Sequence, residues 1–370
     1  MMKKFTLFLL LTAAAVLSAA VAEVELSYRK VTLENRFFTL EFLPDSLGRL
    51  DQIRLKPSDK CLLLPRTLTR VSVDPLYGFY RNNSFGCGEN FWKNYVASRD
   101  GKSRVCRPDA RSIIFENKWY GGLAVDVKRK VTLAPNETLF FCEAEVFNRD
   151  RKKDFFLAPW YAFSPADADS TRLLIPAKGG AKSHTLGNTK FVERDLITDG
   201  PSGLYAPARN WVATVYPAEK CALAIIIPPE EFFPDGAFYT WHGKEGTLSY
   251  RSMEAVLNKS LLAPQAKRKF SCIFAVFYGI TDIKDIAGTT AVDAGSVNGR
   301  LILTLSPARR VPAGRITISV KGDGAEKSAE ITTTELFAGR KYGFAFDMQC
   351  GKISKITGSL PDGSTFDLLI

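Results

Sequence analysis

The stretch VTLENRFFTLEFLPDSLGRL (residues 31–50) decides the fold class. Residues 38–43 alternate between apolar and polar side chains, which is the period-two pattern of a strand with one buried face. Pro44-Asp45 and Gly48 then interrupt the pattern with turn-forming residues. Because the alternation resumes at Leu50, the stretch predicts a β-hairpin.

The same pattern recurs along much of the chain. Short runs rich in β-branched and aromatic residues lie at residues 112–116, 123–129, 139–147, 211–215, 222–227 and 270–278. Beyond the apolar N-terminus, no long segment has the 3.6-residue period of an amphipathic helix, and no repeat has a fixed length. We therefore predict an all-β protein.

A change in composition near residue 285 predicts two β domains. Apolar runs fade between residues 281 and 298, where Gly288 and Gly295 punctuate the sequence. A second alternating series begins at Leu301, with turn signals at the spacing of roughly 8–12 residues that is typical of a small sandwich. We expect a large β domain over residues 23–285, a linker over 286–297 and an immunoglobulin-like β-sandwich over 298–370.

The first residues predict export. Lys3 and Lys4 precede an apolar run from Phe5 to Val21, which ends in small residues at Ala22. This is the pattern of a secretory signal peptide over residues 1–22, cleaved after Ala22. An uncleaved membrane anchor is the alternative, but a typical spanning helix needs about 20 apolar residues. We expect a periplasmic or extracellular protein with no transmembrane segment in the mature chain.

The composition fits a packed globular protein and excludes several classes of function. The sequence is 46% hydrophobic and has a net charge of +11, which can attract an acidic polysaccharide or an anionic membrane surface. We expect no nucleic acid partner, because an export signal is present and nucleic-acid motifs are absent. The sequence also lacks a GxSxG motif, a phosphate loop, a dinucleotide fingerprint and an HExxH motif, so we expect neither a cofactor nor a metal. Cys142, Cys221 and Cys272 lie within apolar runs and are expected in the core.

Aromatic and polar residues are concentrated in four stretches, at residues 77–92, 119–122, 159–163 and 238–243. The first is too rich in Gly and Asn for a regular strand and too aromatic for a plain solvent loop, so we interpret it as a functional loop. Aromatic faces pack against the C–H faces of sugar rings, while Asn, Arg, Asp and Glu bind the hydroxyl groups. These stretches therefore favour a carbohydrate ligand. The alternative is that the aromatic residues fill the core of a large sandwich.

Several motifs resemble the galactose mutarotase-like β-supersandwich superfamily. Leu33–Pro44 followed by Leu47–Leu50 is similar to the "ENxxxxLEFxP…GGRI" hairpin with which members often start, and Leu47 replaces the first glycine. Further likeness lies at Val146–Asp150, Pro159–Phe163, Leu174–Ala177 and Asn210–Val215. The resemblance covers roughly residues 24–285 and implies a supersandwich domain there.

The resemblance also bears on activity. Sugar epimerases of this superfamily use histidines and a glutamate as acid and base around the anomeric carbon. One of these histidines corresponds to Trp160 in this sequence, so the resemblance implies a protein that lacks standard aldose epimerase activity. Independently of the resemblance, glycoside hydrolysis needs a pair of acids close in space, and the available acids are Glu89, Asp167, Asp169, Glu231 and Glu254.

Three hypotheses follow from these observations. The first is a carbohydrate-binding protein whose cleft is lined by Arg81, Glu89, Asn90, Trp92, Trp119, Trp160, Trp241 and His242. The tryptophans would stack on the sugar, and Arg81 and Glu89 would orient it. The second is a polysaccharide lyase or sugar epimerase acting on an acidic sugar, with Glu89 catalytic, His242 or Tyr161 as proton acceptor, and Arg81 neutralising the carboxylate. The third is a structural envelope protein without a ligand.

Overall fold

The computed structural model describes residues 21–23, 28–65, 70–74, 78–82, 89–91, 101–167, 170–177, 180–185, 202–205, 207–232, 238–245, 248–297, 300–322, 325–348 and 353–369. These residues form almost only antiparallel strands, which confirms the all-β prediction. The described helical elements are two 3-10 turns, η2 (Tyr120–Gly122) and η3 (Pro229–Glu231). Within the same residues, no helix has the length and hydropathy needed to cross a bilayer. The predicted signal peptide lies outside the described residues, apart from Val21 and Ala22 in β1.

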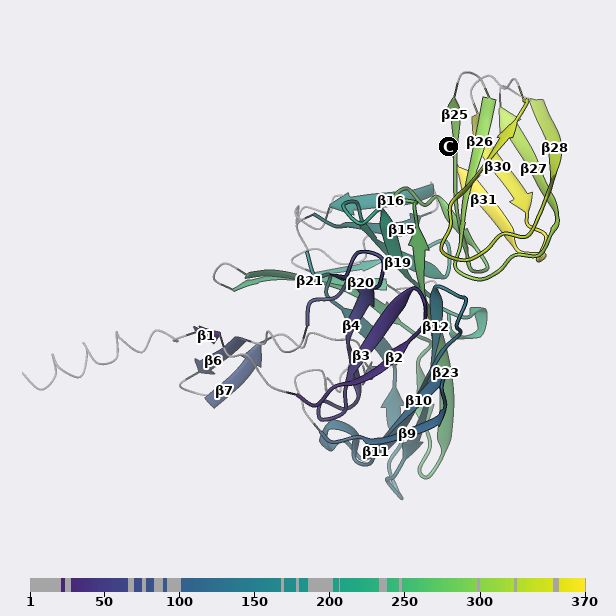
Figure 1. Cartoon of the computed structure of the whole chain (residues 1–370). Coiled ribbons are helices and arrows are strands. Elements are labelled where there is room, and N and C mark those ends of the chain that lie inside the picture. The colour runs from purple at the N-terminus through teal and green to yellow at the C-terminus, as the bar shows by residue number, and fades with distance from the viewer. Residues whose placement is uncertain are drawn as a thin grey trace, which may run out of the picture.

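The larger part of the molecule is built on two extended sheets (Figure 1). The nine-stranded sheet has the order β16 (Gly180–Thr185), β15 (Arg172–Ala177), β18 (Trp211–Tyr216), β19 (Cys221–Ile226), β23 (Lys267–Tyr278), β12 (Leu139–Asn148), β11 (Val125–Leu133), β10 (Ser112–Asn117), β9 (Arg104–Asp109). The five-stranded sheet has the order β17 (Ser202–Tyr205), β20 (Phe238–Glu245), β21 (Leu248–Val256), β14 (Pro159–Phe163), β8 (Glu89–Phe91).

Three smaller sheets complete this part. The predicted hairpin belongs to the sheet β2 (Val31–Glu34), β3 (Phe38–Leu43), β4 (Arg49–Leu55), β5 (Lys60–Cys61). The second sheet is β1 (Val21–Glu23), β6 (Arg70–Asp74), β7 (Gly78–Asn82), and the third is β13 (Phe155–Leu157), β22 (Ser260–Leu262).

The turn between β3 and β4 is formed by residues 44–48. Leu47 and Gly48 both have left-handed backbone conformations, with φ of 59° and 68°. Gly48 has no alternative, because a Cβ there would lie 2.5 Å from Cγ of Phe115. Leu47 has the left-handed conformation although it carries a side chain, and that buried side chain joins the core.

Two motif asparagines have structural roles. The Asn35 side chain donates to the carbonyls of Ala134 and Glu137, both at 2.8 Å, and its Oδ1 accepts from the Phe37 and Phe38 amides. It therefore ties the β2–β3 hairpin to the turn between β11 and β12. Asn148 donates to the carbonyls of Leu262 and Lys153, both at 2.9 Å, and is buried. Such side-chain amides stabilise loops whose backbone groups do not form the regular hydrogen bonds of a β-sheet.

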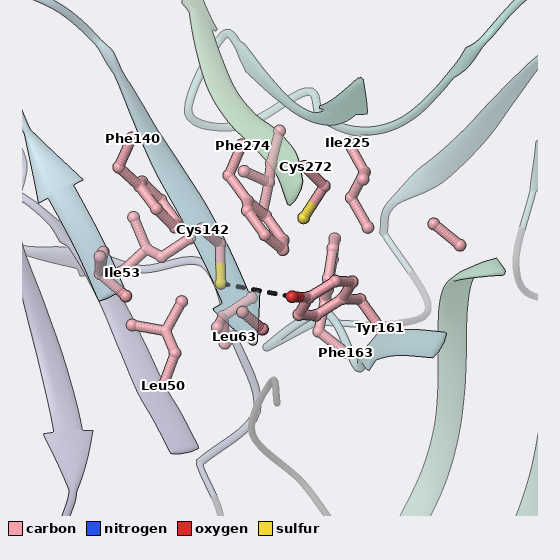
Figure 2. Close-up of a cluster of buried hydrophobic side chains, with 14 of the residues drawn as sticks. Leu50, Ile53, Leu63, Phe140, Cys142, Tyr161, Phe163, Ile225, Cys272 and Phe274 are labelled. Carbon is pink, nitrogen blue, oxygen red and sulfur yellow. Dashed lines mark hydrogen bonds between the residues drawn. The ribbon is translucent and has the colours of Figure 1, made fainter. Parts of the chain in front are cut away.

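The main core lies between the sheets and follows the alternation read from the sequence. In β12, residues 140, 142, 144 and 146 are buried, while residues 141, 143, 145 and 147 are partly or fully exposed. Phe140 and Phe274 stack with ring centroids 4.9 Å apart, and Tyr161 meets Phe274 edge to face (Figure 2). Cys142 and Cys272 are buried here as free thiols, as expected.

The C-terminal residues form two further sheets, which Figure 1 shows as a green-to-yellow lobe beside the larger part. One has the order β24 (Asp285–Ala287), β25 (Thr290–Val297), β26 (Arg300–Pro307), β29 (Tyr342–Phe346), and the other β28 (Ala325–Thr333), β27 (Gly314–Gly322), β30 (Ile353–Ser359), β31 (Thr365–Leu369). The linker predicted over residues 286–297 is wrong, because these residues include β25, which pairs with β26 along its length.

The lobe covers part of the outer face of the nine-stranded sheet. Strands β18 and β19 are buried on both faces, as expected of continuous apolar runs covered on two sides. Ala213, Ala222 and Phe277 on the sheet pack with Ile283 and Ala291 of the C-terminal residues. A second apolar cluster therefore forms at this junction.

A buried carboxylate adds polar contacts to the junction. Asp285 accepts hydrogen bonds from the Trp211 indole at 3.1 Å and from the backbone amide of Asp367 at 3.0 Å. Arg209 pairs with the same carboxylate at 3.5 Å. Burial raises the pKa of Asp285, and these partners oppose that shift. The carboxylate thus links β18 in the large sheet to β31 in the lobe.

Candidate functional site

The five-stranded sheet has one face in the core and one face turned away from it. In β14, Pro159, Tyr161 and Phe163 are buried, whereas Trp160 and Ala162 are only half-buried. In β21, Met253 and Ala255 belong to the core. Alternation assigns the remaining positions to the other face. We call it the Trp160 face, and its described residues are Trp160, Ala162, Ser252, Glu254 and Val256.

Glu254 is the unusual residue of the Trp160 face. It pairs with Ala162 on β14 and is only 4% exposed. Trp160 pairs with Val256, which makes it a diagonal neighbour of Glu254 within reach of a long side chain. Ser252, two residues earlier on the same strand, donates a hydrogen bond to Oε1 of Glu254. A carboxyl group is thus held beside an indole ring on one sheet face.

The surroundings of Glu254 keep its carboxyl group protonated at neutral pH. Burial raises its pKa from 4.5 to about 8, while hydrogen bonds from Ser252 and from the Trp160 indole lower it and only partly offset the effect. Desolvation wins because a buried carboxylate without a counter-charge loses most of its hydration. A neutral carboxyl group can donate one hydrogen bond and accept others, so Glu254 has a donor that an ionised glutamate lacks.

Two further stretches singled out from the sequence reach this sheet through backbone pairing. Asn90 of β8 pairs with Trp160, and Glu89 pairs with Tyr161. In β20, Trp241 pairs with Ser252, and His242 pairs with Arg251. The backbone therefore brings the predicted residues 89–90, 160–161 and 241–242 into one sheet. The side chains of residues 89, 90, 241 and 242 lie outside what the structure describes.

Tyr161 is a core residue, which corrects its predicted role as a proton acceptor in an open cleft. It is 1% exposed, and its hydroxyl lies 3.6 Å from Sγ of Cys142, as Figure 2 shows. The physical reason is the strand period: Tyr161 follows Trp160 directly, so the two side chains point to opposite faces. A sugar on the Trp160 face would meet Trp160 and not Tyr161.

The other predicted residues do not join the Trp160 face in the described structure. Arg81 lies in β7, which belongs to the separate three-stranded sheet, and its side chain is not described. Trp92 lies outside the described residues. Trp119 is 56% exposed and precedes η2, in the connection between β10 and β11. Of the predicted cleft residues whose side chains the structure describes, Trp160 lies on the Trp160 face and Trp119 lies in a separate connection.

Sequence reasoning named Glu254 among five available acids but did not select it. A usable signal was present, because Glu254 stands between Met253 and Ala255 within an otherwise apolar strand end. An acid in such a run is rarely fully buried without a specific role. In the part of the chain that the structure describes, no three His, Cys, Asp or Glu side chains converge as metal ligands would.

Comparisons with known proteins give structural neighbours but no relative by sequence. No protein-family model matches the chain, and no curated protein sequence does. The galactose mutarotase related enzyme of Lactobacillus acidophilus is 12% identical, with a TM-score of 0.44 over 70% of this chain and 100% of that chain. Several of the structural neighbours are galactose mutarotase-like proteins, at low identity and partial coverage.

Two other neighbours are longer proteins. A TPR-domain containing protein of Parabacteroides distasonis is 14% identical, with a TM-score of 0.47 over 67% of this chain. The heparan sulfate lyase HepC of Pedobacter heparinus is 11% identical, with a TM-score of 0.41 over 83% of this chain. This chain spans 47% of the length of the former and 43% of the latter.

Proposed function

We propose that this protein is exported and binds carbohydrate on the Trp160 face, without standard aldose epimerase activity. The observation that supports this proposal is the pairing of Glu254, protonated near pH 7, with the half-buried indole of Trp160. An indole face packs on the C–H face of a sugar ring, and the buried Glu254 carboxyl group accepts a hydrogen bond from the Trp160 indole. Trp160 would therefore supply the sugar contact, and Glu254 would hold its ring in position.

The same carboxyl group favours one alternative function. A group with a pKa of about 8 is well suited to give and take protons near neutral pH. On this alternative, Glu254 is the general acid or base of a polysaccharide lyase or of an epimerase that acts on an acidic sugar. It would then replace Tyr161 in the scheme drawn from the sequence.

Replacing Trp160 with alanine tests the proposed sugar contact. We expect the variant to bind its glycan at least about tenfold more weakly, because a buried tryptophan contact typically contributes about 2 kcal/mol or more to binding. Binding is measured on a glycan array and then by titration calorimetry with the best glycan. Phe337→Ala, an exposed aromatic of the C-terminal lobe, is the matched control and should bind like wild type.

The outcomes separate the three hypotheses. Binding that is lost in Trp160→Ala, with the sugar recovered unchanged, supports the proposal. A new unsaturated product or a faster anomeric exchange that disappears in Glu254→Gln establishes the enzymatic alternative. A wild-type protein that retains no glycan leaves a structural envelope role. Export is tested separately by N-terminal sequencing of the secreted protein, which should begin at Glu23.

A further inference from the structure

Trp119 is an exposed tryptophan held in an unfavourable backbone conformation. Its φ and ψ are 51° and 54°, in the left-handed region, which bulky side chains rarely adopt. More than half of the side chain is exposed, so burial of the indole does not compensate for this strain. Residues held in such a conformation are frequent at ligand sites, where the surrounding structure fixes them.

Two contacts hold Trp119 in this conformation. Its backbone amide donates to Oδ1 of Asp126 at 3.1 Å, and its carbonyl accepts from Gly122 at 2.8 Å across the η2 turn. The next residue, Tyr120, is fully buried and packs edge to face on Phe91, with ring centroids 6.0 Å apart. Because Tyr120 is anchored in the core, the turn presents the neighbouring indole to solvent.

A guanidinium group completes the arrangement. Arg149 lies over the Trp119 ring, 5.3 Å from its centroid, and pairs with Oδ2 of Asp126 at 2.5 Å. One carboxylate therefore fixes both the backbone of Trp119 and the head group of Arg149. The Arg149 carbonyl also accepts from Gln265 at 2.7 Å, so its backbone is fixed as well.

The surroundings of this arrangement are mainly basic. Lys118 precedes Trp119, and the loop after Arg149 carries the exposed residues Arg151, Lys152 and Lys153. Two acids offset part of this charge: Asp150, whose carboxylate accepts hydrogen bonds from the amides of Lys152 and Lys153 at 2.8 and 3.0 Å, and the exposed Asp154. The basic side chains still outnumber them. An anion that approached Trp119 would meet several cationic side chains at once.

We propose that Trp119, Arg149 and the adjacent basic loop form a second contact site, outside the Trp160 face, for a glycan that carries carboxylate or sulfate groups. The indole would pack on a sugar ring, and the guanidinium would bind the anionic substituent. Trp119 is a lone exposed apolar residue among charged neighbours, which favours a glycan over a membrane surface. That the occupant is a glycan rests on the proposed function, whereas the contact site itself rests on the geometry of Trp119.

Trp119→Gly tests the site, because glycine adopts the left-handed conformation without strain. We expect the melting temperature to stay equal or rise, while retention by dextran sulfate or alginate in affinity electrophoresis falls about tenfold. Lys220→Gly is the matched control, since Lys220 is exposed and also left-handed, with φ of 50°. It should keep its retention even though it loses a positive charge. Neutral dextran should not retard the wild type through this site.

The outcomes distinguish this site from the Trp160 face. Loss of anionic retention in Trp119→Gly but not in Trp160→Ala supports the second site, whatever the fate of the first. Unchanged retention in Trp119→Gly, a lowered melting temperature, or an equal loss in Lys220→Gly overturns it. A third result also overturns the proposal: Trp119→Gly keeps its retention by the anionic glycan but no longer binds phosphatidylglycerol vesicles. That result would indicate a membrane contact.

Discussion

Replacing Glu254 with glutamine is expected to remove the loss of stability that this carboxyl group causes between about pH 5 and pH 8. In the folded protein the pKa of Glu254 is raised from 4.5 to about 8, so the folded state retains a proton that the unfolded state releases. The free energy of unfolding of the wild type therefore falls as the pH rises through this window. Raising the pH from below 4.5 to 7 lowers the free energy of unfolding by about 3 kcal/mol through this group, because one pKa unit corresponds to about 1.36 kcal/mol.

Urea unfolding at pH 5 and pH 7.5 measures this effect. Glutamine keeps the shape and the hydrogen-bonding capacity of the protonated acid, so the variant should match the wild type at pH 5 and exceed it at pH 7.5. Glu230→Gln, at an exposed position of η3, should retain the wild-type dependence. If the free energy of unfolding changed equally with pH in the wild type and in Glu254→Gln, this carboxyl group would be ionised and hydrated in the folded protein.

Replacing Asp285 with alanine is expected to destabilise the junction between the large sheet and the C-terminal lobe by about 2–6 kcal/mol, because two buried donors lose their acceptor and each such loss costs about 1–3 kcal/mol. The change deprives the Trp211 indole and the Asp367 amide of their acceptor and leaves Arg209 without its buried partner. Buried donors without an acceptor are the main source of this loss.

Thermal and urea unfolding check the prediction, with tryptophan fluorescence reporting on the surroundings of Trp211. Asp285→Asn should recover part of the stability, because the amide oxygen still accepts one hydrogen bond. Asp282→Ala, at an exposed neighbouring position, should lie within about 0.5 kcal/mol of wild type. A small effect of Asp285→Ala would mean that the apolar cluster alone holds the junction.

The strand pattern could be read from the sequence, whereas the choice of buried face could not. Alternation alone predicts that Trp160 and Tyr161 lie on opposite faces, but it does not say which face meets the core. That choice depends on long-range packing of Tyr161 against Phe270 and Phe274. Alternation also does not predict which site residues become neighbours, because proximity within a sheet depends on strand order and register.

The prediction of a linker over Thr290–Val297 was wrong for a different reason. Its alanines and glycine have low β-propensity, so the sequence favoured a linker. In the structure Ala291, Val292 and Ala294 are buried, and small side chains suit a strand that packs closely against neighbouring elements. Tertiary packing therefore overrides the local preference of these residues. Packing also determines that Glu254 is buried, which its local sequence does not show.

The junction between the sheet and the lobe has a consequence for how this architecture can vary. Strands β18 and β19 carry apolar side chains on the side that the lobe covers, among them Ala213, Val215 and Ala222. A shortened product that stopped before Asp285 would present this surface to water, and such surfaces drive aggregation. Gene fusions or deletions that separate the lobe from the larger part would therefore lower solubility. We expect the two parts to be inherited together.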